Sequence, residues 1–156
     1  MKKLFYLLML PLALLAASCS DDNDFPDVEL ITSFDGATHY NDTIYAVAGD
    51  TLRLTDIQAR PLQGARPAAI SDVSIAVNHR VVYPTPLNPA WQGFPALVTT
   101  APGLNLLQLS FAILQEGKSI SVWNSSYIVK VVASPEDLPE GADPVGPFSF
   151  TSVIRD

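Results

Sequence analysis

The chain has 156 residues, of which 48% are hydrophobic and 16% are charged, and this length is typical of a single domain. Its 16 acidic residues outnumber its 9 basic residues, for a formal net charge of −7. This balance argues against a nucleic-acid partner, because phosphate contacts need a basic surface. One cysteine and two histidines exclude an intrachain disulfide or cysteine-cluster metal site and leave little for a histidine-based relay. We expect no metal and no cofactor.

The amino terminus has the anatomy of an export signal. A positive start, Met1–Lys3, precedes an apolar stretch from Leu4 to Ala17, and small residues lead into Cys19. This order is typical of a secretory signal peptide. The apolar stretch is too short for a membrane-spanning helix, which needs about 20 residues. One alternative is cleavage by the general peptidase, which would leave Cys19 as a free thiol.

The residues that lead into this cysteine read Leu15-Ala16-Ala17-Ser18-Cys19. They resemble the lipobox of bacterial lipoproteins. The resemblance implies that residues 1–18 are removed and that Cys19 carries a diacylglyceryl thioether and an acylated amino terminus. Several acyl chains on one residue form a stable anchor, whereas a single chain binds a membrane only marginally. The membrane is therefore the expected partner of the amino terminus.

The segment 19–27 is polar and acidic, and we interpret it as a tether. After the cysteine it contains Ser20, Asp21, Asp22, Asn23 and Asp24. This run resembles the acidic export signal of Bacteroidetes-type surface lipoproteins, which implies display on the outer face of the outer membrane. Two alternatives stay open, an anchor that faces the periplasm and a solvated linker whose charges keep it extended.

Removal of the signal peptide changes the charge of the chain. It takes away Lys2 and Lys3, which leaves seven basic and 16 acidic residues and a net charge of −9. A face of this charge is not attracted to anionic lipid, so the lipid alone is expected to hold the protein at the membrane.

Residues 28–132 read as short strands between turn signals, with frequent β-branched and aromatic residues. The predicted strands are 28–34, 43–47, 51–55, 72–78, 81–83, 96–100, 107–113 and 120–131. We predict turns at Asp35-Gly36 and at Asn78-His79, because these residue types tolerate the left-handed region. The apolar residues of the last strand change phase between Val122 and Tyr127, which predicts a bulge within residues 123–126.

The segment 133–156 divides into two parts. Residues 133–147 are rich in Pro, Glu, Asp and Gly, and we predict that they are extended and mobile. Residues 148–154 are apolar and form either an extra edge strand or an exposed β-prone peptide. We favour docking on the sheet, because a bare apolar end invites aggregation.

The fold is indicated by two stretches of sequence. One runs from Pro102-Gly103-Leu104 through Gly117-Lys118 to 127–131, and it resembles the last hairpin of bacterial immunoglobulin-like domains. Residues 70–78 resemble the central strand of the same modules. The resemblance implies an all-β fold, a single immunoglobulin-like antiparallel β-sandwich of about seven strands over residues 28–132. The cysteine pair of antibody domains is absent.

Residues that could carry catalysis are few. We interpret His39 and His79 as structural, because no carboxylate stands at zinc-ligand spacing beside either. The acids Glu136, Asp137 and Glu140 lie in the proline-rich tail, where nothing excludes water. No G-x-S-x-G nucleophile elbow occurs. We therefore predict that the chain is not an enzyme.

Two threonines are candidates for modification. Asp42-Thr43-Ile44 and Asp50-Thr51-Leu52 resemble the Asp-Ser/Thr-apolar sequon for O-glycosylation of exported Bacteroidetes-type proteins, which would place the glycan on Thr43 or Thr51. The alternative is ordinary turn chemistry before a strand.

Four aromatic residues are the candidates for ligand contact, Tyr83, Trp91, Phe94 and Trp123. Aromatic faces on a rigid loop can stack on sugar rings or anchor a protein partner. The alternative is that the loop aromatics fold back and close one end of the sandwich. We expect a non-catalytic, surface-exposed outer-membrane lipoprotein that acts in adhesion or as an accessory subunit of an envelope complex. The second hypothesis is a glycan-binding module for polysaccharide capture.

Overall fold

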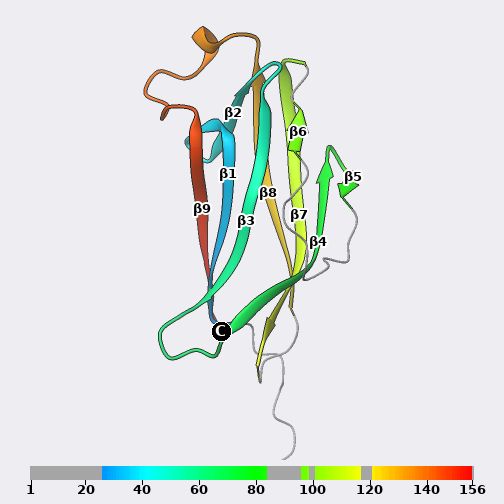
Figure 1. Ribbon diagram of the computed structural model, residues 1–156, viewed down its shortest axis with the longest axis vertical. Coiled ribbons are helices and arrows are strands. Elements are labelled where there is room, and N and C mark those ends of the chain that lie inside the picture. The colour runs from blue at the N-terminus through cyan, green and yellow to red at the C-terminus, as the bar shows by residue number, and fades with distance from the viewer. Residues whose placement is uncertain (1–25, 84–95, 99–100, 117–120, 156) are drawn as a thin grey trace, which may run out of the picture.

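The computed structural model describes residues 26–83, 96–98, 101–116 and 121–155, and most of these lie in strands (Figure 1). The prediction of an all-β chain is confirmed. Among the described residues there are nine strands rather than about seven. The elements are β1 (Val28–Tyr40), β2 (Thr43–Val47), β3 (Thr51–Pro61), β4 (Ala68–Val77), β5 (Arg80–Tyr83), β6 (Ala96–Val98), β7 (Gly103–Gln115), β8 (Ser121–Val132), the 3₁₀ helix η1 (Pro135–Asp137) and β9 (Gly146–Ile154).

The strands form one curled, mixed sheet. Its order is β5-β4-β7-β8-β2-β1-β3-β6, and β9 pairs with β1. In Figure 1, β9, β1 and β3 lie next to one another on the left, whereas β7, β4 and β5 lie on the right. The prediction of a purely antiparallel sheet is wrong at one pair, because β2 runs parallel to β8 from Thr43 opposite Ile128 to Val47 opposite Val132. The short β1–β2 hairpin reverses the chain and sets β2 beside β8 in the same direction.

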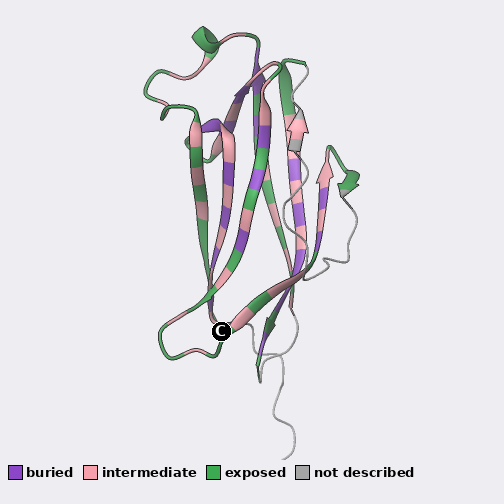
Figure 2. Cartoon of the chain, viewed as in Figure 1, coloured by how far each residue is buried: buried purple, intermediate pink, exposed green. Residues whose placement is uncertain are grey.

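One hydrophobic core lies inside the curl of the sheet. It combines fully buried side chains from separate strands, including Phe34 of β1, Ile75 of β4 and Phe111 of β7. Figure 2 shows buried residues alternating with less buried ones along these strands, as the period of two in a strand requires. Each strand therefore buries apolar side chains on one face. This burial stabilises the fold by about 25 cal/mol for each Å² of apolar surface removed from water.

At Gly36, β1 passes from the part of the sheet that contains β3 and β9 to the part that contains β2. Its pairing with β9 shifts between Phe34 and Ala37, and Gly36 has a φ of 83°. A Cβ atom at Gly36 would lie 2.1 Å from the carbonyl oxygen of Thr51, so only glycine allows this approach. The prediction of a chain-reversing turn at Asp35-Gly36 is wrong, because the signal marks an irregularity inside one long strand.

The predicted turn at Asn78-His79 is confirmed. Both residues have positive φ, 50° and 64°, as a two-residue type I′ hairpin requires. The Asn78 side chain accepts a hydrogen bond from the backbone N–H of Leu106 at 2.8 Å and donates one to the side-chain oxygen of Asn105 at 2.9 Å. The turn is thus fixed to β7.

The predicted bulge in β8 is wrong. Its register with β7 runs without a shift from Val131 opposite Gly103 to Ser121 opposite Ile113. The apolar phase changes because Val122 and Ile128 point outward and are 68% and 49% exposed. The pairing of β7 with its other neighbour, β4, does shift, between Ser71 and Ser74 of β4.

The predicted docking of the carboxyl-terminal segment is confirmed. β9 pairs antiparallel with β1 from Val28 opposite Ile154 to Phe34 opposite Phe148. The preceding tail is not wholly extended, since η1 forms one helical turn in it. No helix in the described part of the chain is long and apolar enough to cross a membrane.

The structure describes the last two residues of the predicted tether, Pro26 and Asp27, and both contact the fold. Pro26 is buried, and the Asp27 N–H donates to Oε1 of Gln115 at 3.1 Å. The Gln115 side chain is itself buried and donates to the carbonyl oxygen of Arg66 at 2.6 Å. One buried amide therefore joins the start of β1, the β3–β4 loop and the end of β7.

Candidate binding face

An open cleft of about 330 Å³ lies on the outer face of β4, β7 and β8. Its volume is at the lower end of the range for small-molecule sites, about 300–1,000 Å³. The lining residues come from four strands and one turn. They are Ser74, Ala76, His79, Val81, Gln108, Leu109, Ser110, Asn124, Ser125 and Ser126.

Strand register arranges the outward side chains of the cleft in two rows. Ser74 of β4 lies opposite Ser110 of β7, which lies opposite Asn124 of β8. Two residues along the strands, Ala76 is opposite Gln108 and Gln108 is opposite Ser126. Neighbouring strands are about 4.8 Å apart and residues i and i+2 about 7 Å apart. The five polar side chains therefore form a regular grid.

The side chains of this grid have unused hydrogen-bonding capacity. Within the described part of the chain, no side-chain hydrogen bond is made by Ser74, Gln108, Ser110, Asn124 or Ser126. None of the ten lining residues is an aspartate, glutamate, lysine or arginine. The cleft thus offers hydroxyl and amide groups, each able to donate and to accept, without a formal charge.

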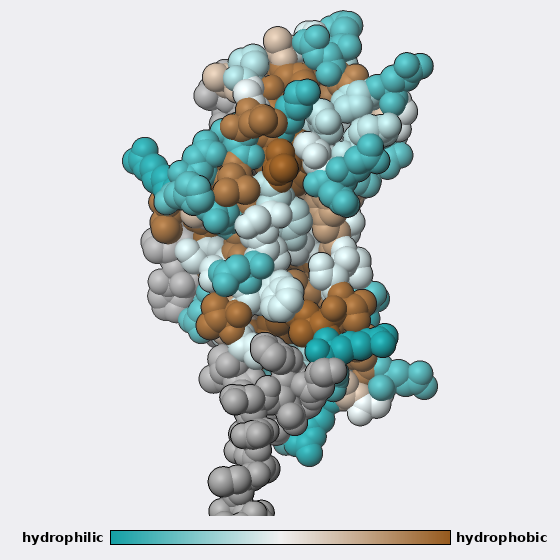
Figure 3. Space-filling model, turned by 180° about the vertical axis from the view of Figure 1, so that it is seen from behind, coloured by the Kyte–Doolittle hydropathy of each residue, from teal (hydrophilic) through white to brown (hydrophobic). Residues whose placement is uncertain are grey.

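Apolar side chains stand at both ends of the polar grid. Leu104 and Ile128 are 72% and 49% exposed toward one end of β7 and β8, and Val122 is 68% exposed toward the other. Figure 3, seen from behind, shows pale and teal polar residues across the middle of the face and brown apolar residues above and below them. The outer face is consequently polar in its centre and apolar at its ends.

The β4–β5 hairpin forms one side of the cleft. His79 lies in the turn and Val81 follows in β5, and both are exposed. His79 holds a positive φ, which is uncommon for a residue other than glycine. Asn78 fixes the position of this turn through its bonds to β7. The sequence interpretation of His79 as a turn residue is confirmed, and the structure adds that its side chain borders a cleft.

Of the four aromatic candidates from the sequence, the structure describes the side-chain packing of Trp123 alone. Tyr83 is the last residue of β5 and pairs with Ile75. Trp123 points inward, is half-buried and packs against the core. Trp91 and Phe94 lie outside the described residues, as do the lipidation and export candidates at 19–24.

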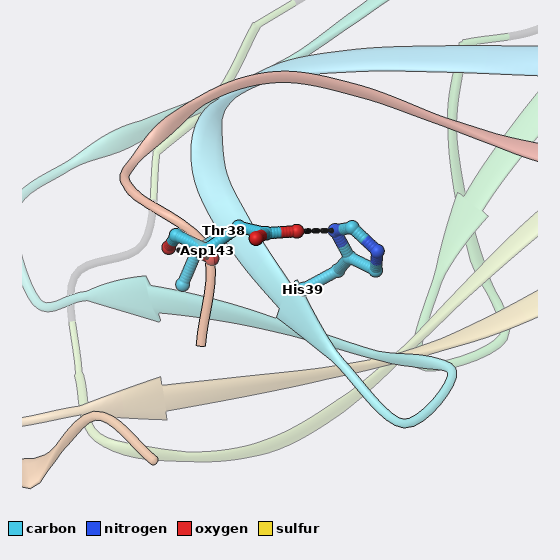
Figure 4. Close-up of polar contacts among 3 residues, drawn as sticks. All are labelled: Thr38, His39 and Asp143. Carbon is cyan, nitrogen blue, oxygen red and sulfur yellow. Dashed lines mark hydrogen bonds and ion pairs between the residues drawn. The ribbon is translucent and has the colours of Figure 1, made fainter. Parts of the chain in front are cut away.

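His39 occupies a different environment, between β1 and β9. Its ring stacks on Phe148 with centroids 5.1 Å apart and meets the edge of Phe150 at 5.8 Å. Figure 4 shows its Nδ1 facing the Asp143 carboxylate across 3.9 Å, while the Thr38 hydroxyl donates to the Asp143 carbonyl oxygen. These contacts make the imidazole part of the packing that holds β9 on β1.

The Asp143 carboxylate faces the His39 ring from a solvent-exposed position. Nδ1 of His39 is buried without a hydrogen-bond partner, and the Asp143 side chain is 73% exposed. Among the described residues, no three His, Cys, Asp or Glu side chains are grouped so as to hold a metal ion.

The two threonines of the O-glycosylation prediction lie at strand starts. Thr43 begins β2 after the Asn41-Asp42 turn, and Thr51 begins β3. Both are half-buried. Their modification stays a prediction.

The polar grid was missed in the sequence. A signal for it exists, because Gln108 and Ser110 alternate with the buried Leu107, Leu109 and Phe111. Alternation predicts that such residues face outward, but only the register shows that the outward residues of three strands meet. Comparison of the chain with protein-family models, with curated proteins and with solved structures finds no match.

Proposed function

We propose that this chain is a lipid-anchored binding module of the outer membrane, exposed at the cell surface, which acts in adhesion or as an accessory subunit of an envelope complex. One observation carries the proposal. The outer face of β4, β7 and β8 has a cleft lined by polar side chains that make no side-chain hydrogen bonds within the described chain. Convergent polar groups in a concave surface are typical of a ligand site.

The proposed anchor is the lipid on Cys19. Its support is the signal-like start, the lipobox-like residues 15–19 and the acidic run Ser20–Asp24. The described part of the structure begins at Pro26, close after these residues in the chain. Such a short connection would hold the β module near the outer leaflet.

The proposed architecture is an immunoglobulin-like sandwich. What supports it is the division of the sheet into β9-β1-β3-β6 and β5-β4-β7-β8-β2, whose inward side chains belong to one core. Two such sheet portions facing each other over a shared core are the arrangement of a sandwich.

The anchoring part of the proposal is tested on native material. Mass spectrometry of the amino-terminal peptide should find Cys19 as the first residue, with acyl chains attached. Protease added to intact cells should remove the β module, and Cys19→Ala should abolish the acylated peptide. A bare thiol, a retained leader or complete protection from protease on intact cells would contradict surface anchoring.

The binding part is tested by site-specific crosslinking on intact cells. A photoreactive phenylalanine analogue replaces Ser126 in the cleft, and the same analogue replaces Gln58 as the control, since Gln58 is exposed on β3. We expect a discrete crosslinked product from position 126 and none from position 58. An envelope protein in that product supports the accessory role, and an extracellular component supports adhesion. No product at 126, or the same product at both positions, would contradict the proposed binding face.

The aromatic version of the glycan hypothesis receives less support. Trp123 packs against the core and so presents no outward platform for stacking. Ligand contact by Tyr83, Trp91 and Phe94 stays a prediction.

A further inference from the structure

We infer that the cleft on β4, β7 and β8 binds an uncharged, hydroxyl-rich ligand, which is the chemistry of a neutral glycan. The inference rests on the proposed function, because it names the ligand class of the same binding face. It assigns the contact to the polar grid Ser74, Gln108, Ser110, Asn124 and Ser126, not to the aromatic residues.

Hydrogen-bonding capacity is the first reason for this ligand class. A sugar hydroxyl donates one hydrogen bond and accepts others, so its best partners also do both. Serine hydroxyls and the amides of asparagine and glutamine have this property. All five grid side chains are of these types, and none is engaged by another side chain in the described structure. A ligand can therefore replace water at these groups without breaking hydrogen bonds between side chains of the protein.

Charge is the second reason. An anionic ligand such as a phosphate or carboxylate is held best by arginine or lysine, and a cationic ligand by carboxylates. The described lining residues include neither, and the whole chain carries a net charge of −7. The net negative charge of the chain would repel an anion. No lysine or arginine among the described lining residues would offset this repulsion. The lining thus discriminates in favour of a neutral ligand.

Shape and apolar contacts are the third reason. A sugar ring has a polar rim and apolar C–H faces, so its site needs both kinds of surface. In the cleft, Ala76 and Val81 lie among the polar lining residues. The cleft is lined by the short side chains of Ser74, Ser110 and Ser126 and by His79 and Val81 of the β4–β5 hairpin.

The test uses the full chain, purified from membranes in lauryldimethylamine oxide, a detergent without a sugar headgroup. The probes are neutral oligosaccharides of glucose, mannose, galactose and xylose at millimolar concentrations, with oligogalacturonic acid as the anionic counterpart. Binding is measured by saturation-transfer NMR, and the contact is mapped by amide shifts in the isotope-labelled protein. Amide shifts should move in β4, β7 and β8 and stay constant in β3 and β9.

The decisive variant is Gln108→Ala combined with Asn124→Ala, and the matched control is Gln58→Ala on β3. We expect the double variant to weaken binding of the best neutral probe about tenfold, the effect of losing two hydrogen bonds, with unchanged melting temperature. The control should bind as the parent does, and oligogalacturonic acid should bind more weakly than every neutral probe that binds.

Two results would overturn the inference. One is the absence of binding to every neutral probe, and the other is binding that the double variant leaves unchanged. If position 126 still crosslinks to an envelope protein under the first result, the ligand class fails while the proposed binding face stands. If Cys19 is bare and the neutral probe still binds, the ligand class stands while surface anchoring fails.

Discussion

The two faces of β7 and β8 are built from alternate residues of the same strands, yet one face packs in the core and the other lines the cleft. Toward the inside, Phe111 and Leu109 are almost fully buried and contribute to the core. Toward the outside, Ser110 and Asn124 lie in the cleft and make no side-chain hydrogen bonds in the described structure. One strand thus supplies stability with one face and binding chemistry with the other.

This difference separates two kinds of mutational effect. Removing an inward side chain leaves a cavity, and the loss of packing contributes directly to the free energy of unfolding. Removing an outward polar side chain that makes no bond leaves the folded state nearly unchanged. A harmless substitution on the inner face, or a substitution on the outer face that unfolds the protein, would contradict this division.

The largest effect is expected for Phe111→Ala. Phe111 is 1% exposed and lies in the core cluster, so the substitution should lower the free energy of unfolding by about 3–5 kcal/mol. Denaturant unfolding followed by circular dichroism measures the change. The control is its outward neighbour, Ser110→Ala, which should change the free energy by less than about 0.5 kcal/mol. Equal effects of the two substitutions would contradict the division between faces.

The second prediction concerns the crossing of β1 at Gly36. Gly36→Ala places a Cβ atom against the Thr51 carbonyl in a backbone with φ of 83°, and we expect a loss of about 3 kcal/mol. Gly64 also has a φ of 83° but has no atom within 4 Å of the added Cβ. Gly64→Ala should therefore cost only about 1 kcal/mol. If both variants lose the same stability, the close approach to Thr51 contributes nothing.

The third prediction tests the buried polar junction at the end of β7. Gln115→Leu keeps similar volume but removes the acceptor for the Asp27 N–H and the donor to the Arg66 carbonyl. The loss of these two hydrogen bonds at a buried site should cost about 2 kcal/mol. Gln63→Leu, at an exposed loop position, should be nearly neutral. A neutral Gln115→Leu would show that apolar burial alone stabilises this end of the sheet.

The inner face was largely predictable from the sequence, because alternation alone determines it. Val73, Ile75, Leu107 and Leu109 fall on one phase of their strands and are all buried. Alternation fails where both faces are apolar. Val122 and Ile128 are apolar and exposed, and their phase was therefore misinterpreted as a bulge.

The outer face was not predictable, because it depends on register between distant segments. Ser74 and Asn124 are separated by 50 positions and are brought into one row by Ser110 between them. Short-range signals contain no information on such pairing. These signals also cannot distinguish a chain-reversing turn from an irregularity inside a long strand, as Asp35-Gly36 shows. The turn at Asn78-His79 was predictable, because a hairpin turn depends only on local backbone conformation.

The smallest effect has the opposite sign and concerns the turn beside the cleft. The turns Asn41-Asp42 and Asn78-His79 have positive φ at both residues, and glycine is the residue preferred at the second position of such a turn. His79→Gly should therefore raise the free energy of unfolding by about 0.5–1 kcal/mol. Asp42→Gly, in the turn away from the cleft, should stabilise by a similar amount. Thermal unfolding measures both, and a rise in melting temperature of about 2–4 °C is expected for each.

The two turn variants differ in their expected effect on the cleft. His79 lines the cleft and Asp42 does not, so only His79→Gly should change binding of a neutral oligosaccharide. Greater stability with weaker binding would indicate that the left-handed histidine is a strained residue used for contact with the ligand. Greater stability with unchanged binding would show that His79 borders the cleft without contributing to it, and would restrict the contact to the side chains of β4, β7 and β8. A loss of stability in both variants would contradict the premise that the two turns carry the same backbone strain.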